Sequence, residues 1–205
     1  MIDRNDSTLK KTHGPFKAKG AVLLDRDGVI SQQTAFVNEP ADLKLIDGAA
    51  ASIARLNRAG WPVVVVTNQG GIAMGYLTED TLHAIHVKMK ALLAEAGAHV
   101  DAIYYCAHHE HAKIPEYKAD CCCRKPKIGM LEQARDELCI DLAKSIFVGD
   151  STTDILAGQR AGCFTILVET GFGGQDGKAE AEPDATVADL SGAADLILTQ
   201  LPSGT

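Results

Sequence analysis

The fold class is decided by residues 22–28, which read VLLDRDG. An apolar run ends abruptly on Asp25 and Asp27, and a glycine follows. A short, continuously apolar run is typical of a strand that is buried on both faces of a parallel sheet. The two carboxylates then lie at the carboxyl end of that strand, where open α/β sheets bind their ligands. The alternative interpretation is a strand that runs into an ordinary polar Asp-Gly turn.

The composition is that of a globular protein. The chain has 205 residues, 46% hydrophobic and 23% charged, which suits one domain. The net charge of −7 gives no electrostatic reason to expect a nucleic acid or an anionic membrane as partner. No stretch is long and apolar enough to span a bilayer, and the polar N-terminus lacks the apolar core of a signal peptide. We therefore expect a cytoplasmic protein, and we expect a monomer.

Apolar runs alternate with amphipathic segments along the chain. Residues 1–18 are predicted to be a tail and residues 19–205 a single domain. Strands are predicted over 21–24, 61–66, 100–105, 145–148 and 165–168, with a short edge strand at 186–187. Helices are predicted over 49–59, 78–96, 130–138, 153–161 and 191–201, the second capped by Thr78 and the last by Ser191. This alternation predicts an α/β fold, a doubly wound parallel sheet with helices on both faces.

Polar side chains follow three of the predicted strands. They are Asp25 and Asp27, then Thr67 and Asn68, then Asp150 with Asp154 four residues on. Parallel strands bring these ends to one edge of the sheet. Clustered carboxylates repel one another unless a cation lies among them, and ligands that are all oxygen favour Mg²⁺. Taken alone, Asp150 has a second interpretation as an acid stabilised by a helix dipole.

Four of the six cysteines lie within one short segment that also contains histidines. Two close groups of ligands stand about a dozen residues apart, Cys106 with His108 and Cys121 with Cys123. Three thiolates and one imidazole make a closed tetrahedral Zn²⁺ set, which is typical of a structural site. Competing ligands are Cys122, His109 and His111. Free surface cysteines and a catalytic zinc site with an open position are the remaining interpretations.

Four motifs, taken in order, resemble those of the haloacid dehalogenase-type (HAD) phosphatases. They are Asp25-Arg26-Asp27-Gly28, Thr67-Asn68, Arg124-Lys125-Pro126 and Gly149-Asp150-x-x-x-Asp154. The resemblance covers about residues 20 to 170. It implies a HAD-like Rossmannoid fold and a phosphoric monoester hydrolase.

The same resemblance implies a role for each of the two aspartates of residues 22–28. Asp25 would be the nucleophile that forms an aspartyl-phosphate, which splits hydrolysis into two easier steps. Asp27 would protonate the leaving oxygen and later take a proton from the attacking water. The side chains of Asp25 and Asp150, with the backbone carbonyl of Asp27, would hold Mg²⁺.

The other motifs would bind the phosphoryl group. Thr67 and backbone amides from Asn68 onward would hold phosphoryl oxygens, and Lys125 would add a positive charge. Asp154 would orient Lys125 or the metal shell. Taken alone, Lys125 has a second interpretation as a solvated surface lysine.

The pattern Cys-x-His-His followed by Cys-x-Cys-Arg-Lys-Pro resembles one branch of that family, the D-glycero-D-manno-heptose-1,7-bisphosphate 7-phosphatases. This implies a cytoplasmic enzyme without a large cap domain that acts on a small phosphorylated sugar. It also implies a zinc loop at about 106–123, held by Cys106, His108, Cys121 and Cys123. The predicted substrate-binding residues are Gln33, Thr34, Ala35, Phe36, Asn68, Gln69, Gly70, Arg124 and Ser151.

Two departures from that branch keep other functions open. Ala107 stands where the branch usually has proline, and residues 33–36 replace a usual Gly-Tyr pair. Histidinol-phosphate phosphatase, or a phosphatase of another small phosphorylated metabolite, is therefore the second hypothesis. A non-catalytic, zinc-stabilised binding module is the third, although such a module would have no need of the complete catalytic set.

Overall fold

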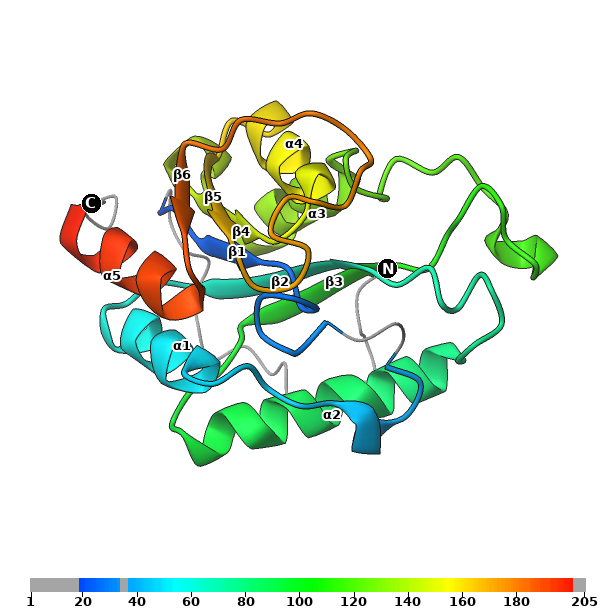
Figure 1. Ribbon diagram of the computed structural model, residues 1–205, viewed down its shortest axis with the longest axis horizontal. Coiled ribbons are helices and arrows are strands. Elements are labelled where there is room, and N and C mark those ends of the chain that lie inside the picture. Colours follow the sequence, from blue (N-terminus) through cyan, green and yellow to red (C-terminus); the bar gives the residue numbers. More distant parts are fainter. Residues whose placement is uncertain (1–18, 34–36, 201–205) are drawn as a thin grey trace.

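The computed structural model describes residues 19–33 and 37–200 (Figure 1). A parallel sheet lies at its centre, with the strand order β3-β2-β1-β4-β5-β6. The strands are β1 (Val22–Leu24), β2 (Val63–Asn68), β3 (Ala102–Cys106), β4 (Ile146–Gly149), β5 (Phe164–Val168) and β6 (Ala185–Val187). The predicted tail, together with residues 34–36 and 201–205, lies outside the described residues.

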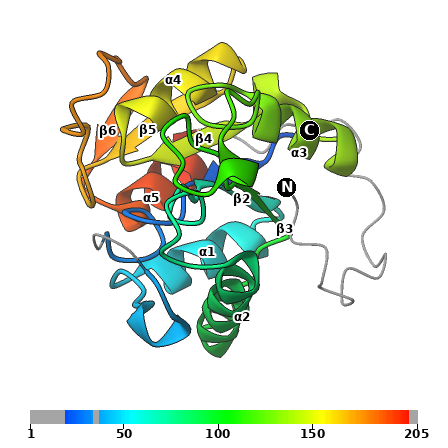
Figure 2. The same ribbon diagram turned by 90° about the vertical axis from the view of Figure 1, so that its right-hand side faces the viewer.

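Helices cover both faces of the sheet, as the alternation predicts. They are α1 (Ala49–Arg58), α2 (Glu79–Glu95), α3 (Gly129–Leu138), α4 (Thr152–Arg160) and α5 (Leu190–Gln200). Figures 1 and 2 show α3 and α4 on one side of the sheet and α1 and α2 on the other. Helix α5 lies beside α1 and shares its hydrophobic cluster. None of the helices described here has the length and hydropathy needed to cross a membrane.

Strand β1 is apolar throughout because each of its faces meets a different core. Val22 and Leu24 lie in the cluster formed with α1, α2 and α5, whereas Leu23 lies in the cluster formed with α3 and α4. All three side chains are fully buried. Burial of such a side chain stabilises the fold by about 1.5–3 kcal/mol. Residues 22–24 therefore anchor the strand whose end carries Asp25.

The predicted helix starts are confirmed at α2 and wrong at α5. The Thr78 hydroxyl caps α2 by accepting a hydrogen bond from a backbone N–H of its first turn. At α5 the Asp189 carboxylate accepts from the Gly192 N–H, 2.9 Å away. Ser191 lies inside the helix, and its hydroxyl instead contacts Ser52 of α1 at 3.1 Å. The cap of α5 is therefore two residues earlier than predicted.

Candidate active site

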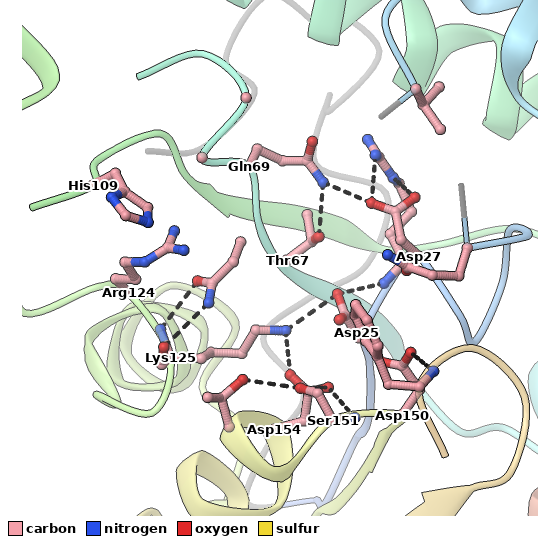
Figure 3. Close-up of a pocket in the computed structure, with 18 of the residues that line it drawn as sticks. Asp25, Asp27, Thr67, Gln69, His109, Arg124, Lys125, Asp150, Ser151 and Asp154 are labelled. Atoms are coloured by element: carbon pink, nitrogen blue, oxygen red, sulfur yellow. Dashed lines mark hydrogen bonds and ion pairs between the residues drawn. The ribbon is translucent and has the colours of Figure 1, made fainter. Parts of the chain in front are cut away.

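Polar residues at the ends of β1, β2 and β4 meet at the carboxyl edge of the sheet (Figure 3). Asp25 and Asp150 follow their strands, whereas β2 runs past the predicted end at residue 66 and includes Thr67 and Asn68 as its last two residues. Because β1 lies between β2 and β4, Asp25, Thr67 and Asp150 come together in one cavity of about 340 Å³. A cavity of this size suits a small-molecule ligand. Every described residue that the sequence assigned to catalysis or substrate binding lines it. Residues 34–36 lie outside the described residues.

Three acidic side chains form the floor of the cavity. Asp25, Asp150 and Asp154 each offer a carboxylate oxygen, and these oxygens lie within 4.8 Å of one another. Burial raises the pKa of Asp25 to about 6. Burial and the neighbouring Asp25 carboxylate raise the pKa of Asp150 to about 8. Buried carboxylates this close are destabilised without a cation, and a donor set made only of oxygen fits Mg²⁺.

Asp154 is already occupied by partners from this chain. One of its oxygens lies 2.7 Å from the Lys125 ammonium. The other accepts hydrogen bonds from the Ser151 N–H and hydroxyl, at 3.1 and 2.7 Å. Of the two roles predicted for Asp154, the geometry favours the orientation of Lys125. Asp25 and Asp150 are then the side chains left to hold a metal.

Two glycines leave room for the Asp150 carboxylate. A Cβ added at Gly28 would lie 2.1 Å from Asp150 Oδ2, and one at Gly171 would lie 2.0 Å from it. Gly28 also has a φ of +84°, which side-chain-bearing residues rarely adopt. The same oxygen accepts a hydrogen bond of 2.8 Å from the Phe172 N–H. Gly28 therefore makes space for Asp150, which lies more than a hundred residues later in the chain.

Lys125 is a buried lysine and not a solvated one. It is 3% exposed, and its ammonium lies 3.1 Å from Asp25 and 2.8 Å from the Val66 carbonyl oxygen. Burial acts to lower the pKa of Lys125, but the Asp154 and Asp25 carboxylates raise it above its usual value. The ammonium therefore stays charged beside the predicted nucleophile.

Asn68 holds the Lys125 segment in place. The Asn68 amide donates to the Lys125 carbonyl oxygen at 3.2 Å and accepts from the Lys125 N–H at 3.0 Å. Although Asn68 lines the cavity, its side chain is engaged with the backbone of Lys125. Its side chain thus fixes the position of Lys125 in the cavity.

Asp27 points away from the acidic floor. Its carboxylate lies 2.6 Å from Arg26 Nη2 and is not among the clustered ligand oxygens. Burial acts to raise the pKa of Asp27, but the Arg26 guanidinium holds this pKa below its usual value. This orientation agrees with the predicted use of the Asp27 backbone carbonyl, rather than its side chain, at a metal.

The rim of the cavity includes residues that sequence reasoning missed. His109, Phe172 and Lys178 line it together with the predicted Arg124. Burial, the Arg124 guanidinium and the Lys178 ammonium all lower the pKa of His109. Arg124 and Lys178 therefore bring two positive charges to the cavity, and the Lys178 ammonium lies 3.9 Å from the Asp176 carboxylate. Phe172 and Lys178 lie between the predicted strands at 165–168 and 186–187, where the sequence has no periodic pattern.

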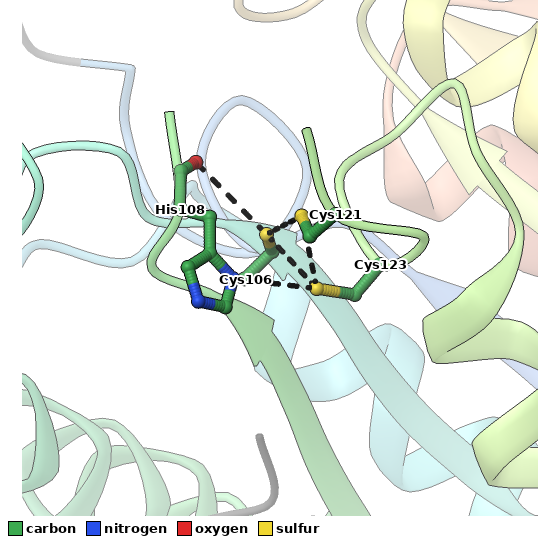
Figure 4. A group of neighbouring side chains, drawn as sticks. All are labelled: Cys106, His108, Cys121 and Cys123. Atoms are coloured by element: carbon green, nitrogen blue, oxygen red, sulfur yellow. Dashed lines mark hydrogen bonds between the residues drawn. The ribbon is translucent and has the colours of Figure 1, made fainter. Parts of the chain in front are cut away.

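The Cys/His segment forms a second cluster (Figure 4). Its member Cys123 directly precedes Arg124 in the chain. Ligand atoms of Cys106, His108, Cys121 and Cys123 lie within 4.8 Å of one another. The three sulfurs are 3.2–3.4 Å apart, and Cys123 Sγ lies 3.7 Å from His108 Nδ1. Three sulfurs and one nitrogen that converge in this way fit Zn²⁺. Of the competing ligands, Cys122 and His111 are exposed and His109 lines the active-site cavity, so all three lie outside the cluster.

Comparison with known proteins adds the family. Residues 122–193 match the HAD-hydrolase-like family. The chain is 41% identical over 189 residues to the D-glycero-D-manno-heptose-1,7-bisphosphate 7-phosphatase of Thermosynechococcus vestitus, which covers 88% of this chain and 96% of the relative. The chain belongs to this family of HAD phosphatases.

Other members of the family agree in sequence and in structure. The phosphatase is 46% identical over 155 residues to the D-glycero-beta-D-manno-heptose-1,7-bisphosphate 7-phosphatase of Vibrio cholerae, covering 75% of this chain and 83% of the relative. It also matches the crystal structure of D,D-heptose 1,7-bisphosphate phosphatase from B. bronchiseptica, complexed with magnesium and phosphate. That match has a TM-score of 0.78 and 39% identity, and covers 88% of this chain and 99% of that one. The predicted HAD-like fold and phosphoric monoester hydrolase activity are thus confirmed.

Proposed function

We propose that this phosphatase removes the 7-phosphate of D-glycero-D-manno-heptose 1,7-bisphosphate. The observation that carries the proposal is a single cavity with carboxylates and Lys125 at its floor and cationic side chains at its rim. The floor suits the phosphate that reacts, and the rim suits a second phosphate on the same small molecule. Relatives 41–46% identical to this chain are named for that substrate.

The reaction runs through a covalent intermediate on Asp25. Its carboxylate oxygen attacks phosphorus while Asp27 gives a proton to the leaving sugar oxygen. A water that has lost its proton to Asp27 then attacks phosphorus, which releases phosphate and regenerates Asp25. The Thr67 hydroxyl and the Lys125 ammonium bind phosphoryl oxygens throughout. Asp25 and Asp150 would hold Mg²⁺, which when bound offsets the negative charge of the nucleophile and the phosphate.

The second phosphate would bind at the rim. Arg124 donates a hydrogen bond of 3.2 Å to the His108 carbonyl oxygen, which fixes one side of its guanidinium. A guanidinium presents paired donors to a phosphate. The Lys178 ammonium lies 3.9 Å from Asp176 Oδ2. Asp176 is itself held by hydrogen bonds from the Thr152 N–H and hydroxyl, at 3.2 and 2.8 Å, which keeps Lys178 near the cavity. Histidinol phosphate carries an ammonium group and only one phosphate, so this rim disfavours it.

The direct test compares two substrates. With Mg²⁺ present, kcat/KM for phosphate release should be at least ~10-fold higher for heptose 1,7-bisphosphate than for histidinol phosphate, since one additional charged contact accounts for about that factor. A preference for histidinol phosphate would instead show that the enzyme is a histidinol-phosphate phosphatase, in which the same residues have the same roles. Slow turnover of both substrates would contradict the proposed substrate.

A matched pair of lysine variants tests the rim. The Lys178→Met variant should narrow the preference for heptose 1,7-bisphosphate over heptose 7-phosphate, because only the former has a second phosphate. The Lys88→Met variant removes the same charge from an exposed position on α2. It should keep the preference of the unaltered enzyme. Equal preferences in both variants would remove Lys178 from the proposed site.

We also propose a structural Zn²⁺ at Cys106, His108, Cys121 and Cys123. Four protein ligands leave no open position, so the zinc would take no part in the chemistry. Such a site needs reduced thiols, which supports the cytoplasm as the working compartment.

Addition of Mg²⁺ should stabilise the protein as well as activate it. At a concentration ~100 times its dissociation constant, a ligand that binds only the folded state adds about 2.7 kcal/mol, or roughly 5–10 °C in Tm. Thermal unfolding with and without Mg²⁺ measures this shift, and chelation should reverse it together with phosphate release. The Asp150→Asn variant should lose most of the shift. A full shift in that variant would place the metal elsewhere.

A further inference from the structure

Arg26 lies between the two motif aspartates and is almost completely buried. Its exposure is 1%, although a guanidinium stays charged at any pH that the fold tolerates. Buried charges are found where they are paired, because an unpaired one is very costly. The sequence gives Arg26 no role beyond its place in residues 22–28. Its partners in the structure therefore indicate what it does.

The main partner of Arg26 is the carboxylate of Asp27, which it contacts twice. Arg26 Nε donates to Asp27 Oδ1 at 3.0 Å, and Nη2 lies 2.6 Å from Oδ2. The Ser31 hydroxyl donates to Oδ1 at 3.0 Å, and the Gln69 amide donates to Oδ2 at 3.1 Å. Each carboxylate oxygen thus has two donors. A paired contact between guanidinium and carboxylate fixes both the distance and the plane of the acid.

Arg26 and Gln69 connect Asp27 to the rest of the site. The Arg26 N–H donates to Asp25 Oδ1 at 2.7 Å, so its backbone orients the nucleophile while its side chain orients Asp27. Gln69 lies between Asp27 and Thr67, and it donates to the Thr67 hydroxyl at 3.0 Å (Figure 3). On the far side of the guanidinium, Nη1 lies 3.5 Å from the buried His86 Nε2.

We propose that Arg26 is a positioning residue that holds Asp27 where it exchanges protons with the leaving oxygen and with water. The inference rests on the proposed role of Asp27 in the aspartyl-phosphate mechanism. Arg26 makes no chemical step itself. Its loss would leave the Asp27 carboxylate with only the Ser31 and Gln69 donors and free to rotate, and proton transfer is sensitive to such displacements.

Two substrates with different leaving groups distinguish this positioning role from a merely structural one. A sugar alkoxide leaves poorly unless it is protonated, whereas p-nitrophenolate leaves without a proton. The ratio kcat/KM includes steps only as far as the formation of aspartyl-phosphate, so it does not include the attack of water. A residue that acts through Asp27 should therefore change kcat/KM for the sugar phosphate far more than for p-nitrophenyl phosphate.

The experiment measures both substrates with Arg26→Met, Asp27→Asn and the double variant. In Arg26→Met, kcat/KM for the sugar phosphate should fall on the order of 10²-fold, the lower end of what a general acid contributes, with a much smaller fall for p-nitrophenyl phosphate. Asp27→Asn should show the same selective loss. The double variant should be no worse than Asp27→Asn alone, because both changes remove one function. Equal falls for the two substrates, or additive losses, would overturn the proposal.

A second variant covers the case in which Arg26→Met does not fold. Arg26→Lys keeps the buried charge but loses the paired contact. It should show the same selective loss for the sugar phosphate, on the order of 10-fold, with its Tm measured alongside. An unselective loss would again contradict the proposal. If the enzyme prefers another alkyl phosphate, the comparison is made with that ester, so failure of the proposed substrate is distinct from failure of this inference.

Discussion

Replacement of Asp25 by asparagine should lower kcat for phosphate release by about 10⁴-fold or more. The asparagine amide has the shape of the carboxylate but cannot form the bond to phosphorus. The fold should remain, because Lys125 keeps its 2.7 Å contact with Asp154. Removal of one of three crowded acids also relieves repulsion at the cavity floor. Steady-state kinetics and a thermal unfolding curve of the same preparation measure the two effects.

The matched control for this variant is Asp136→Asn, which neutralises an exposed acid on α3 that pairs with the neighbouring Arg135. It should keep the activity of the unaltered enzyme. Substantial activity in Asp25→Asn would rule out the covalent mechanism. A collapse of Tm in Asp25→Asn would show that the carboxylate is needed for the fold and not only for the reaction.

Replacement of Cys121 by serine should remove zinc and stability together. Among residues 107–125 only Ala107 and Lys125 are buried, so this loop has few apolar contacts of its own. A structural zinc site supplies the missing free energy. We expect zinc content to fall from one ion per chain toward none, with a loss of about 3–5 kcal/mol, or roughly 10 °C in Tm. Metal analysis and thermal unfolding measure the two quantities.

The neighbouring Cys122→Ser variant is the control. Cys122 is exposed and lies outside the clustered ligands, so its replacement should leave zinc content and Tm unchanged. Unchanged zinc content in Cys121→Ser, or zinc loss in Cys122→Ser, would show that the ligand set is wrong. Activity should fall with zinc in Cys121→Ser, because Arg124 and Lys125 directly follow the ligand Cys123.

The sequence predicted the sheet well because both faces of its central strands are buried. Residues 22–24 are apolar throughout for this reason, and the end of that run correctly located Asp25 at the cavity. The start of α5 was harder to predict, since serine and aspartate both cap helices. The structure favours Asp189, because Ser191 is used in the contact with Ser52 on α1. That choice depends on how two distant helices pack, which no local pattern contains.

The cavity was predictable at its floor and unpredictable at its rim. Floor residues such as Asp25 and Asp150 stand at strand ends, and the strand order alone brings them together. Phe172 and Lys178 reach the rim because their loop folds back over Asp150. The loop can approach Asp150 because residue 171 is a glycine, since a Cβ at that position would collide with the Asp150 carboxylate. A glycine in the sequence does not by itself reveal such a close approach.

The central place of β1 has a consequence for synthesis of the protein. Strand β1 pairs with β2 on one side and with β4 on the other. As the nascent chain emerges from the ribosome, the edge that faces β4 stays open until residues 146–149 have been made. An open edge and an uncovered Leu23 invite wrong pairing with other chains during that interval. Asp25 is thus translated more than a hundred residues before Asp150, and its site can assemble only after β4 has been made.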